Sequence, residues 1–323
     1  MPMSGQPDPF ARFLGHPNLP SPTGVALEVL ALADREDATV DQFVEIIRTD
    51  PALVQRMLRI INSPFSGTSR PILDVRTVAI LLGIRTVAVI ALGISVIDRK
   101  HGATCRSFNY RAFWPRSLAR AVAMERLCCI GRDLSPPEGF TLGLLSDMGA
   151  LVLANAAPDE YAPLIDAATD ESDLLRRERN HFGITRHELT ARLLAHWGLP
   201  AQLSRMPIMA LQGDAPQKPP QRRYLQITRK LAFANQLATL IVAPVIDSDD
   251  LHALMDDAVA CGVGRESFEQ TFDGITAQWR DAGKVFEVST RRVPPAAEIL
   301  SRAAQKSEAL RQAGALHHFI SPS

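Results

Sequence analysis

Hydrophobic positions recur along the chain with the three- and four-residue spacing of amphipathic helices, and no stretch shows the sustained alternation of a strand. Short polar breaks, many with proline or glycine, cut this pattern into segments of helix length. The segments predicted to be helical are 24–37, 40–49, 52–62, 77–97, 109–131, 139–156, 159–169, 171–182, 186–198, 201–212 and 223–243, with two more amphipathic helices reaching about residue 288. The pattern therefore predicts an essentially all-α fold without internal repeats.

Two of these helices begin with recognisable capping residues. Thr39, followed three residues later by Gln42, has the spacing of a capping box. Asp50 can cap a helix, and Pro51 suits the first helical position because its fixed φ angle is already helical. We therefore expect helices to start directly after Thr39 and Asp50.

The most apolar run, residues 77–97, has the length of a membrane-spanning helix. Gly83, Arg85 and Gly93 interrupt it, and an arginine in the middle of a bilayer is costly. We expect two buried helices joined near Gly83 and no membrane insertion. The N-terminus also lacks the apolar core of a signal peptide, which predicts a cytoplasmic protein.

Charge and cysteine content narrow the classes of partner and cofactor. Among 323 residues, Lys+Arg and Asp+Glu are equal at 35 each, so overall charge gives no reason to expect a nucleic-acid partner. The four cysteines show no CxxC spacing, and we interpret them as reduced thiols. No cofactor is indicated.

Five stretches form an ordered set of motifs: 19–67, with a Leu-Pro opening, a DPAL helix start and an NS…G turn; 77–92, TVAILLGIRTVAVIAL; 113–123, FWPRSLARAVA; 144–153, LLSDMGALVL; and 184–200, ITRHELTARLLAHWGLP. Together they resemble the HDOD family, the HD-related output domains of bacterial signalling proteins. The resemblance implies a multi-helix fold related to HD phosphohydrolases, with two packed helical lobes. We interpret the matching positions mainly as helix caps, turn residues and core anchors: Asp50, Pro51, Asn62, Ser63, Gly83, Trp114, Trp197 and Pro200.

The resemblance also divides the chain into parts. We expect an extended N-terminal segment, an N-terminal helical lobe, a degenerate HD-like lobe, C-terminal helices packed on that lobe, and a mobile tail. Their boundaries are 1–18, 19–105, 106–215, 216–290 and 291–323.

In HD hydrolases, histidine and aspartate ligands hold metal ions that activate water. The resemblance places the first ligand at Arg116 and the next two at Ser146 and Asp147, and a later histidine pair falls near 209–214, which has no histidine. Arginine cannot bind a cation, because it keeps its proton. We therefore expect a vestigial pocket with neither a metal nor catalysis.

Asp147 shares a face of the predicted 139–156 helix with Gly143, Leu144 and Leu151, which predicts that it is buried. A buried carboxylate needs a partner. In the HD arrangement, position 116 lies beside position 147, so we predict a buried ion pair in which Arg116 takes the place of the metal. The alternative is that the two side chains never meet.

His187 admits two interpretations. It lies in the first turn of a helix capped by Thr185 and Glu188, where a lone polar residue is usually exposed, and exposure is our expectation. The alternative is that His187 faces the vestigial pocket.

For function, the resemblance implies a non-catalytic regulatory module that acts through protein partners in bacterial signalling. Candidate partners are cyclic-di-GMP enzymes of the GGDEF or EAL type, response regulators and sensor kinases. Two alternatives remain: a sensor that binds a nucleotide in the vestigial pocket, and a divergent metal-dependent phosphohydrolase. The oligomeric state stays open. The expected contact surfaces are 62–75, 213–221 and 293–323.

Overall fold

The computed structural model describes residues 8–14, 16, 22–62, 71–97, 104–131, 133–199, 203–205 and 222–301. Within these ranges the regular structure is helical and no strand occurs. The all-α prediction is therefore confirmed.

The helices follow one another with short connections. The first group is α1 (Gly24–Ala33), α2 (Val40–Ile47), α3 (Pro51–Ile61), α4 (Val75–Leu82) and α5 (Ile84–Ile97). The middle group is α6 (Tyr110–Gly131), α7 (Pro136–Leu145), α8 (Met148–Ala156), α9 (Pro158–Ala167), α10 (Glu171–Phe182) and α11 (Arg186–His196). The last group is α13 (Arg222–Val242), α14 (Ser248–Ala260) and α15 (Arg265–Phe286).

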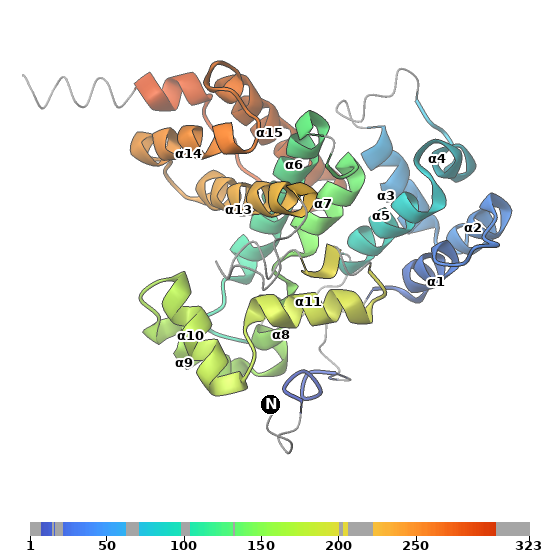
Figure 1. Cartoon of the computed structure of the whole chain (residues 1–323), viewed down its shortest axis with the longest axis horizontal. Coiled ribbons are helices and arrows are strands. Elements are labelled where there is room, and N and C mark those ends of the chain that lie inside the picture. Colours follow the sequence, from blue (N-terminus) through green and yellow to red (C-terminus); the bar gives the residue numbers. More distant parts are fainter. Residues whose placement is uncertain are drawn as a thin grey trace, which may run out of the picture.

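Helices α6 and α7 form the centre of the molecule (Figure 1). Helix α7 packs between α6 and α5. On its other contacts, α5 packs against α1, α3 and α4 of the first group. Helices α13 and α15 pack on α6 from the other side. Helices α8 to α11 extend below this centre in Figure 1, with α11 packed against α8. The packing joins the three groups, and the boundaries between the expected lobes stay a prediction.

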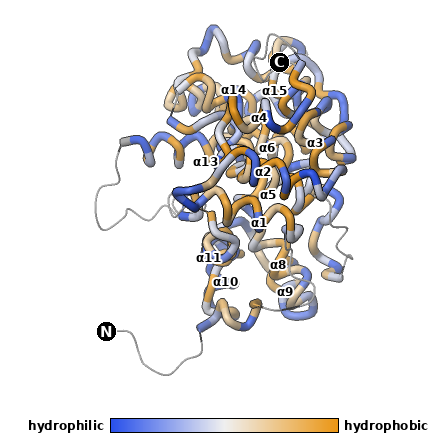
Figure 2. Tube along the Cα trace, turned by 90° about the vertical axis from the view of Figure 1, so that its right-hand side faces the viewer, coloured by the Kyte–Doolittle hydropathy of each residue, from blue (hydrophilic) through white to orange (hydrophobic). Residues whose placement is uncertain are grey.

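The two most apolar segments serve as core. Figure 2 shows apolar residues through the middle of the molecule and polar residues along its rim. Residues 136–156 are long and apolar enough to cross a membrane, but 94% of the apolar 18-residue window within them is buried in the fold. Helices α4 and α5 meet at 119°, and Gly83 between them has φ +81°, a left-handed backbone that favours glycine. The expected pair of helices joined at Gly83 is confirmed, but only α5 is mostly buried, because Ile80 and Leu81 of α4 are exposed.

Capping residues act as the sequence predicts. Thr39 and Gln42 form a reciprocal capping box at the start of α2. The Leu53 amide donates to Asp50 Oδ1 at 3.0 Å, and Pro51 is the first residue of α3.

The remaining family positions have structural roles where the structure describes them. The Asn62 side chain donates to the carbonyls of Leu58 and Ile72 and accepts from the Ile72 amide. These bonds join the end of α3 to the loop before α4. Trp197 is buried at the end of α11, and Trp114 on α6 is half-buried. Ser63 and Pro200 lie outside the described residues.

Three expectations about local structure are wrong. Residues 9–14 form turns rather than an extended segment, because Phe10 and Phe13 are buried in the core. Part of the supposed mobile tail is packed, since Val293 and Ile299 are buried and 296–301 is helical; residues 302–323 lie outside the described chain. The predicted 139–156 helix is broken at residues 146–147.

Candidate functional site

The break between α7 and α8 positions the residues that the HD resemblance singles out. Ser146 is the C-cap residue of α7, and its hydroxyl donates to the Gly143 carbonyl at 3.1 Å. Asp147 stands at the N-cap of α8 but makes no side-chain capping bond. Its carboxylate is therefore directed at other groups, whereas the Ser146 hydroxyl is used within its own helix.

Two glycines on either side of this break bring neighbouring helices close. A Cβ at Gly143 would lie 2.7 Å from the Arg120 carbonyl oxygen on α6. A Cβ at Gly149 would lie only 1.9 Å from the Arg186 carbonyl oxygen on α11. The Gly149 amide also donates to Thr190 Oγ1 at 2.8 Å. The absence of side chains at these positions lets α6 and α11 approach Asp147 from two sides.

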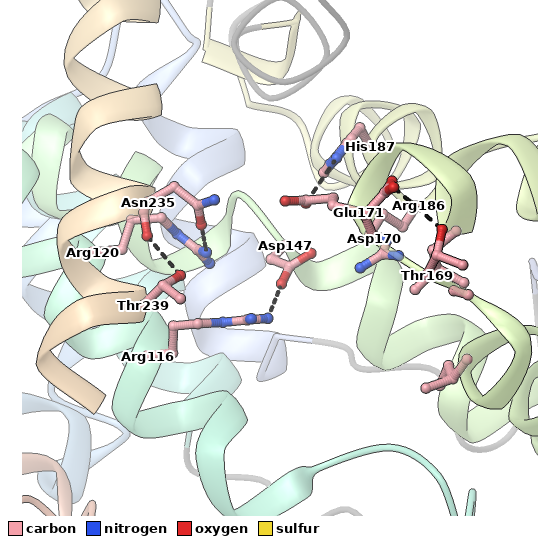
Figure 3. A pocket seen from close by; sticks show the side chains of 13 residues that line it. Arg116, Arg120, Asp147, Thr169, Asp170, Glu171, Arg186, His187, Asn235 and Thr239 are labelled. Atoms are coloured by element: carbon pink, nitrogen blue, oxygen red, sulfur yellow. Dashed lines mark hydrogen bonds and ion pairs between the residues drawn. The ribbon is translucent and has the colours of Figure 1, made fainter. Parts of the chain in front are cut away.

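Arg116 and Asp147 form the predicted ion pair. Arg116 Nη2 lies 2.8 Å from Asp147 Oδ2 (Figure 3). Burial is unequal, because 8% of the Asp147 side chain is exposed against 33% of the Arg116 side chain. Burial alone would raise the Asp147 pKa, but the surrounding guanidinium groups outweigh it, and the pKa is lowered. Asp147 is therefore ionised at neutral pH.

Arg120, which sequence analysis did not single out, ties three helices together at this site. It lies one turn after Arg116 on α6 and is 2% exposed. Its guanidinium donates to the Gly143 carbonyl at 2.7 Å, to Asn235 Oδ1 on α13 at 2.9 Å and to Ser117 Oγ at 3.4 Å. Burial lowers its pKa to about 10, so it stays charged at neutral pH. Its four-residue spacing from Arg116 is the only sequence signal that pointed to it.

A second ion pair, between Arg186 and Glu178, was also not predicted from the sequence. Glu178 is fully buried and accepts from Arg186 Nε at 2.8 Å, from the Arg186 amide at 2.8 Å and from the Tyr161 hydroxyl at 2.9 Å. Burial raises the Glu178 pKa, with the Arg186 charge opposing that rise. The pair fixes the Arg186 guanidinium beside Asp147.

His187 is buried, and the expectation that it is exposed is wrong. It retains 1% exposure because the close approach of α11 to α8 at Gly149 turns the first turn of α11 inward. Neither ring nitrogen has a hydrogen-bond partner among the described residues. Burial lowers its pKa to about 4, with the Asp147 charge opposing and the Arg186 charge assisting. His187 is therefore neutral at pH 7 and faces the pocket.

These groups line a cavity of about 310 Å³. Arg116 and Arg120 come from α6, Asp147 from the α7–α8 turn, and Arg186 and His187 from α11. The rest of its wall comes from α13 and from the end of α9 to the first turn of α10: Asn235, Thr239, Ile165, Ala168, Thr169, Asp170, Glu171 and Leu174. Of the residues predicted for a vestigial pocket, Arg116, Asp147 and His187 line this cavity, whereas Ser146 is buried and does not line it. That the pocket is vestigial stays a prediction.

The arrangement of the residues around this cavity does not fit a metal ion of the HD kind, although Asp147, Asp170, Glu171 and His187 line it. Imidazole and carboxylate ligands are the usual donors for such ions. Within the described ranges, no group of three or more His, Cys, Asp or Glu residues is arranged to hold one. Arg116 presents a fixed positive charge where the resemblance places a ligand, and its partner is Asp147. We therefore assign no metal to these residues.

The Arg116–Asp147 pair leads to a double-mutant prediction. Arg116→Ala and Asp147→Ala should each lower the free energy of unfolding by about 2 kcal/mol, below the 3–5 kcal/mol typical of a fully buried pair, because Arg116 is partly solvated. The double variant should lose clearly less than the sum of the two single losses. Urea unfolding of the four proteins measures this coupling. Strict additivity would show that the pair contributes nothing.

His187 should make the protein sensitive to acid. Unfolded, its pKa is near 6.5, and folded it is about 4. Between these values the unfolded state binds more protons, so stability falls as the pH drops through this window. Between pH 7 and pH 5, the free energy of unfolding of the wild type should fall by on the order of 2 kcal/mol more than that of His187→Leu. Urea unfolding at both pH values tests this, and parallel losses in the two proteins would contradict it.

Comparisons with known proteins identify relatives of this chain. The HDOD domain profile matches residues 19–210. The chain is 35% identical to the MmoQ response regulator of Methylococcus capsulatus, over 79% of this chain and 97% of that one, with a TM-score of 0.49. No protein of the curated set matches.

Two further solved structures share the fold. An HDOD domain protein of Geobacter sulfurreducens is 20% identical, with a TM-score of 0.60 over 87% of this chain and 97% of that one. A candidate phosphohydrolase of Shewanella amazonensis SB2B is 22% identical, with a TM-score of 0.64 over 85% of this chain and 98% of that one. The fold is thus the HD-related one predicted from sequence. Since the HDOD profile spans more than half of its length, the chain belongs to the HDOD family.

Proposed function

We propose that this chain is a non-catalytic regulatory module of bacterial signal transduction, located in the cytoplasm and acting through protein partners. Membership of the HDOD family and 35% identity to a response regulator support the signalling role. The observation that carries the non-catalytic part is the Arg116–Asp147 ion pair at 2.8 Å. A guanidinium supplies the positive charge that Asp147 requires, so the carboxylate is stable without a metal ion.

The test of the non-catalytic part is a search for metal-dependent hydrolysis. The purified protein is assayed with Mn²⁺ or Mg²⁺ against bis(p-nitrophenyl) phosphate and cyclic-di-GMP, and its metal content is measured by mass spectrometry. We expect no stoichiometric transition metal and no turnover above a protein-free control. Robust turnover that requires metal and disappears in Asp147→Ala would establish the alternative, a divergent phosphohydrolase.

The partner role is tested by cross-linking in the native cell, with the full chain and with a form truncated at its C-terminus. Residues up to 301 include packed core positions such as Ile299, so the truncation removes only residues 302–323. The partners we expect are signalling proteins of the GGDEF, EAL, response-regulator or kinase classes. Recovery of the same proteins by an unrelated helical control would refute a specific role, and so would recovery of no signalling protein. Retention by nucleic acid alone would contradict the protein-partner proposal.

A further inference from the structure

The cavity beside Asp147 contains hydrogen-bond donors that the described chain does not satisfy. Arg186 Nη2 and both ring nitrogens of His187 are buried without a hydrogen-bond partner among the described residues. Their side chains are 10% and 2% exposed, and both line the cavity. Buried polar groups are nearly always paired in native proteins, so unpaired ones at one cavity indicate a missing acceptor.

Charges of both signs surround these donors. Arg116, Arg120 and Arg186 carry three positive charges on the cavity wall, and Asp147, Asp170 and Glu171 carry three negative ones. Asp170 caps α10, where it accepts from the Asp173 amide at 2.8 Å. Asp147 offsets one of the positive charges through its bond to Arg116, and the buried Glu178 lies behind Arg186. A neutral imidazole offers one N–H donor beside them. The case for an anion therefore rests on the unpaired donors of Arg186 and His187 rather than on an excess of positive charge.

A carboxylate of the chain itself already reaches into this space. Glu171, the first residue of α10, extends across the cavity toward His187 (Figure 3). Its Oε1 is 3.9 Å from His187 Nε2, which is too far for a hydrogen bond. The Glu171 side chain is 56% exposed and can swing into water at little cost. Glu171 thus places a negative charge near the donors without satisfying them.

We propose that this cavity binds the phosphate group of a small molecule, and that Glu171 occupies the site until the ligand displaces it. The donors approach from two sides, Arg116 from α6 and Arg186 with His187 from α11. A tetrahedral oxyanion offers enough oxygens to bind all three, whereas a planar carboxylate has two. The volume of about 310 Å³ lies at the lower end of small-molecule sites and leaves room for a modest organic body against Ile165 and Leu174.

This inference rests on the proposed non-catalytic function, because it keeps Asp147 paired with Arg116 rather than bound to a metal. Binding is therefore measured with EDTA present, by thermal unfolding and calorimetry of the full chain. The probes are inorganic phosphate, adenosine 5′-monophosphate and adenosine, with chloride at matched ionic strength. A ligand that binds only the folded state must raise Tm in a saturable way.

Two variants locate the binding. His187→Leu removes one donor and should weaken phosphate binding about tenfold or more, the effect of losing a hydrogen bond to a charged group. Because the His187 nitrogens have no partner among the described residues, this variant should still fold without loss of stability at pH 7. Glu171→Gln removes the competing charge and should tighten binding by roughly threefold to tenfold. Glu269→Gln, an equal charge change at an exposed position of α15, is the matched control and should leave the affinity unchanged.

The outcomes separate cleanly. Tighter binding of the nucleotide than of inorganic phosphate identifies a phosphorylated small molecule, and equal binding identifies free phosphate; both require the two variant effects. No saturable rise in Tm with either phosphate probe overturns the inference. A rise that is the same in His187→Leu, Glu171→Gln and Glu269→Gln also overturns it, because binding then lies elsewhere. Metal-dependent hydrolysis without EDTA would refute the proposed function, whereas absence of binding alone leaves that function intact.

Discussion

A Gly149→Ala variant is expected to be strongly destabilised, by at least about 3 kcal/mol, at the upper end of the cost of overpacking a core. The added Cβ would lie 1.9 Å from the Arg186 carbonyl oxygen and 2.9 Å from the Thr190 amide nitrogen. Both are backbone atoms, so no rotamer change relieves the clash, and α8 and α11 must separate. The separation also strains the bond from the Gly149 amide to Thr190 Oγ1.

Gly274→Ala on α15 is the matched control. It makes the same change within a helix, but a Cβ there meets nothing within 4 Å. Alanine is the better helix former by about 1 kcal/mol, so this variant should be unchanged or slightly more stable. Urea unfolding of the three proteins gives the comparison. A Gly149→Ala loss below about 1 kcal/mol, the ordinary size for point mutations, would mean that α8 and α11 are not held at this distance.

Glu178→Ala should cost about 3–5 kcal/mol, the usual effect of breaking a buried pair. Its carboxylate is fully buried and accepts from Arg186 and Tyr161, as described above. The variant leaves the Arg186 guanidinium buried without its counter-charge and removes the acceptor of the Tyr161 hydroxyl. Because Arg186 also lines the cavity, the loss of stability should be accompanied by weaker phosphate binding.

Two controls separate the pair from general effects of substitution. Glu178→Gln keeps the size and an acceptor but removes the charge, and its loss should fall between those of wild type and Glu178→Ala. Glu269→Ala changes an exposed glutamate and should stay within about 0.5 kcal/mol of wild type. Chemical unfolding monitored by circular dichroism measures all of them. An equal, small loss in Glu178→Ala and Glu269→Ala would show that the buried network does not stabilise the fold.

Much of the fold could be predicted because its signals are local. Helix periodicity, the capping box at Thr39 and the proline after Asp50 act within a few residues of where they occur in the chain. The ordered motifs indicated the HD-related fold, and with it the pairing of Arg116 with Asp147 across separate helices. These inferences needed no knowledge of which helix faces pack together.

The cavity depended on packing that no local pattern encodes. The first turn of α11 looks like an exposed helix start, yet His187 is buried, because Gly149 lets α8 and α11 come into backbone contact. Arg120 and Arg186 look like ordinary charged positions of amphipathic helices, and only their neighbours across the fold make them part of the site.

The amino-acid sequence alone therefore determined the helical architecture and the family, since each follows from residue type and spacing along the chain. The tertiary structure decided which charges meet in the cavity and which donors there remain unpaired. The physical reason is that burial and charge pairing depend on distances between helices far apart in sequence, and at this site two small residues, Gly143 and Gly149, set those distances.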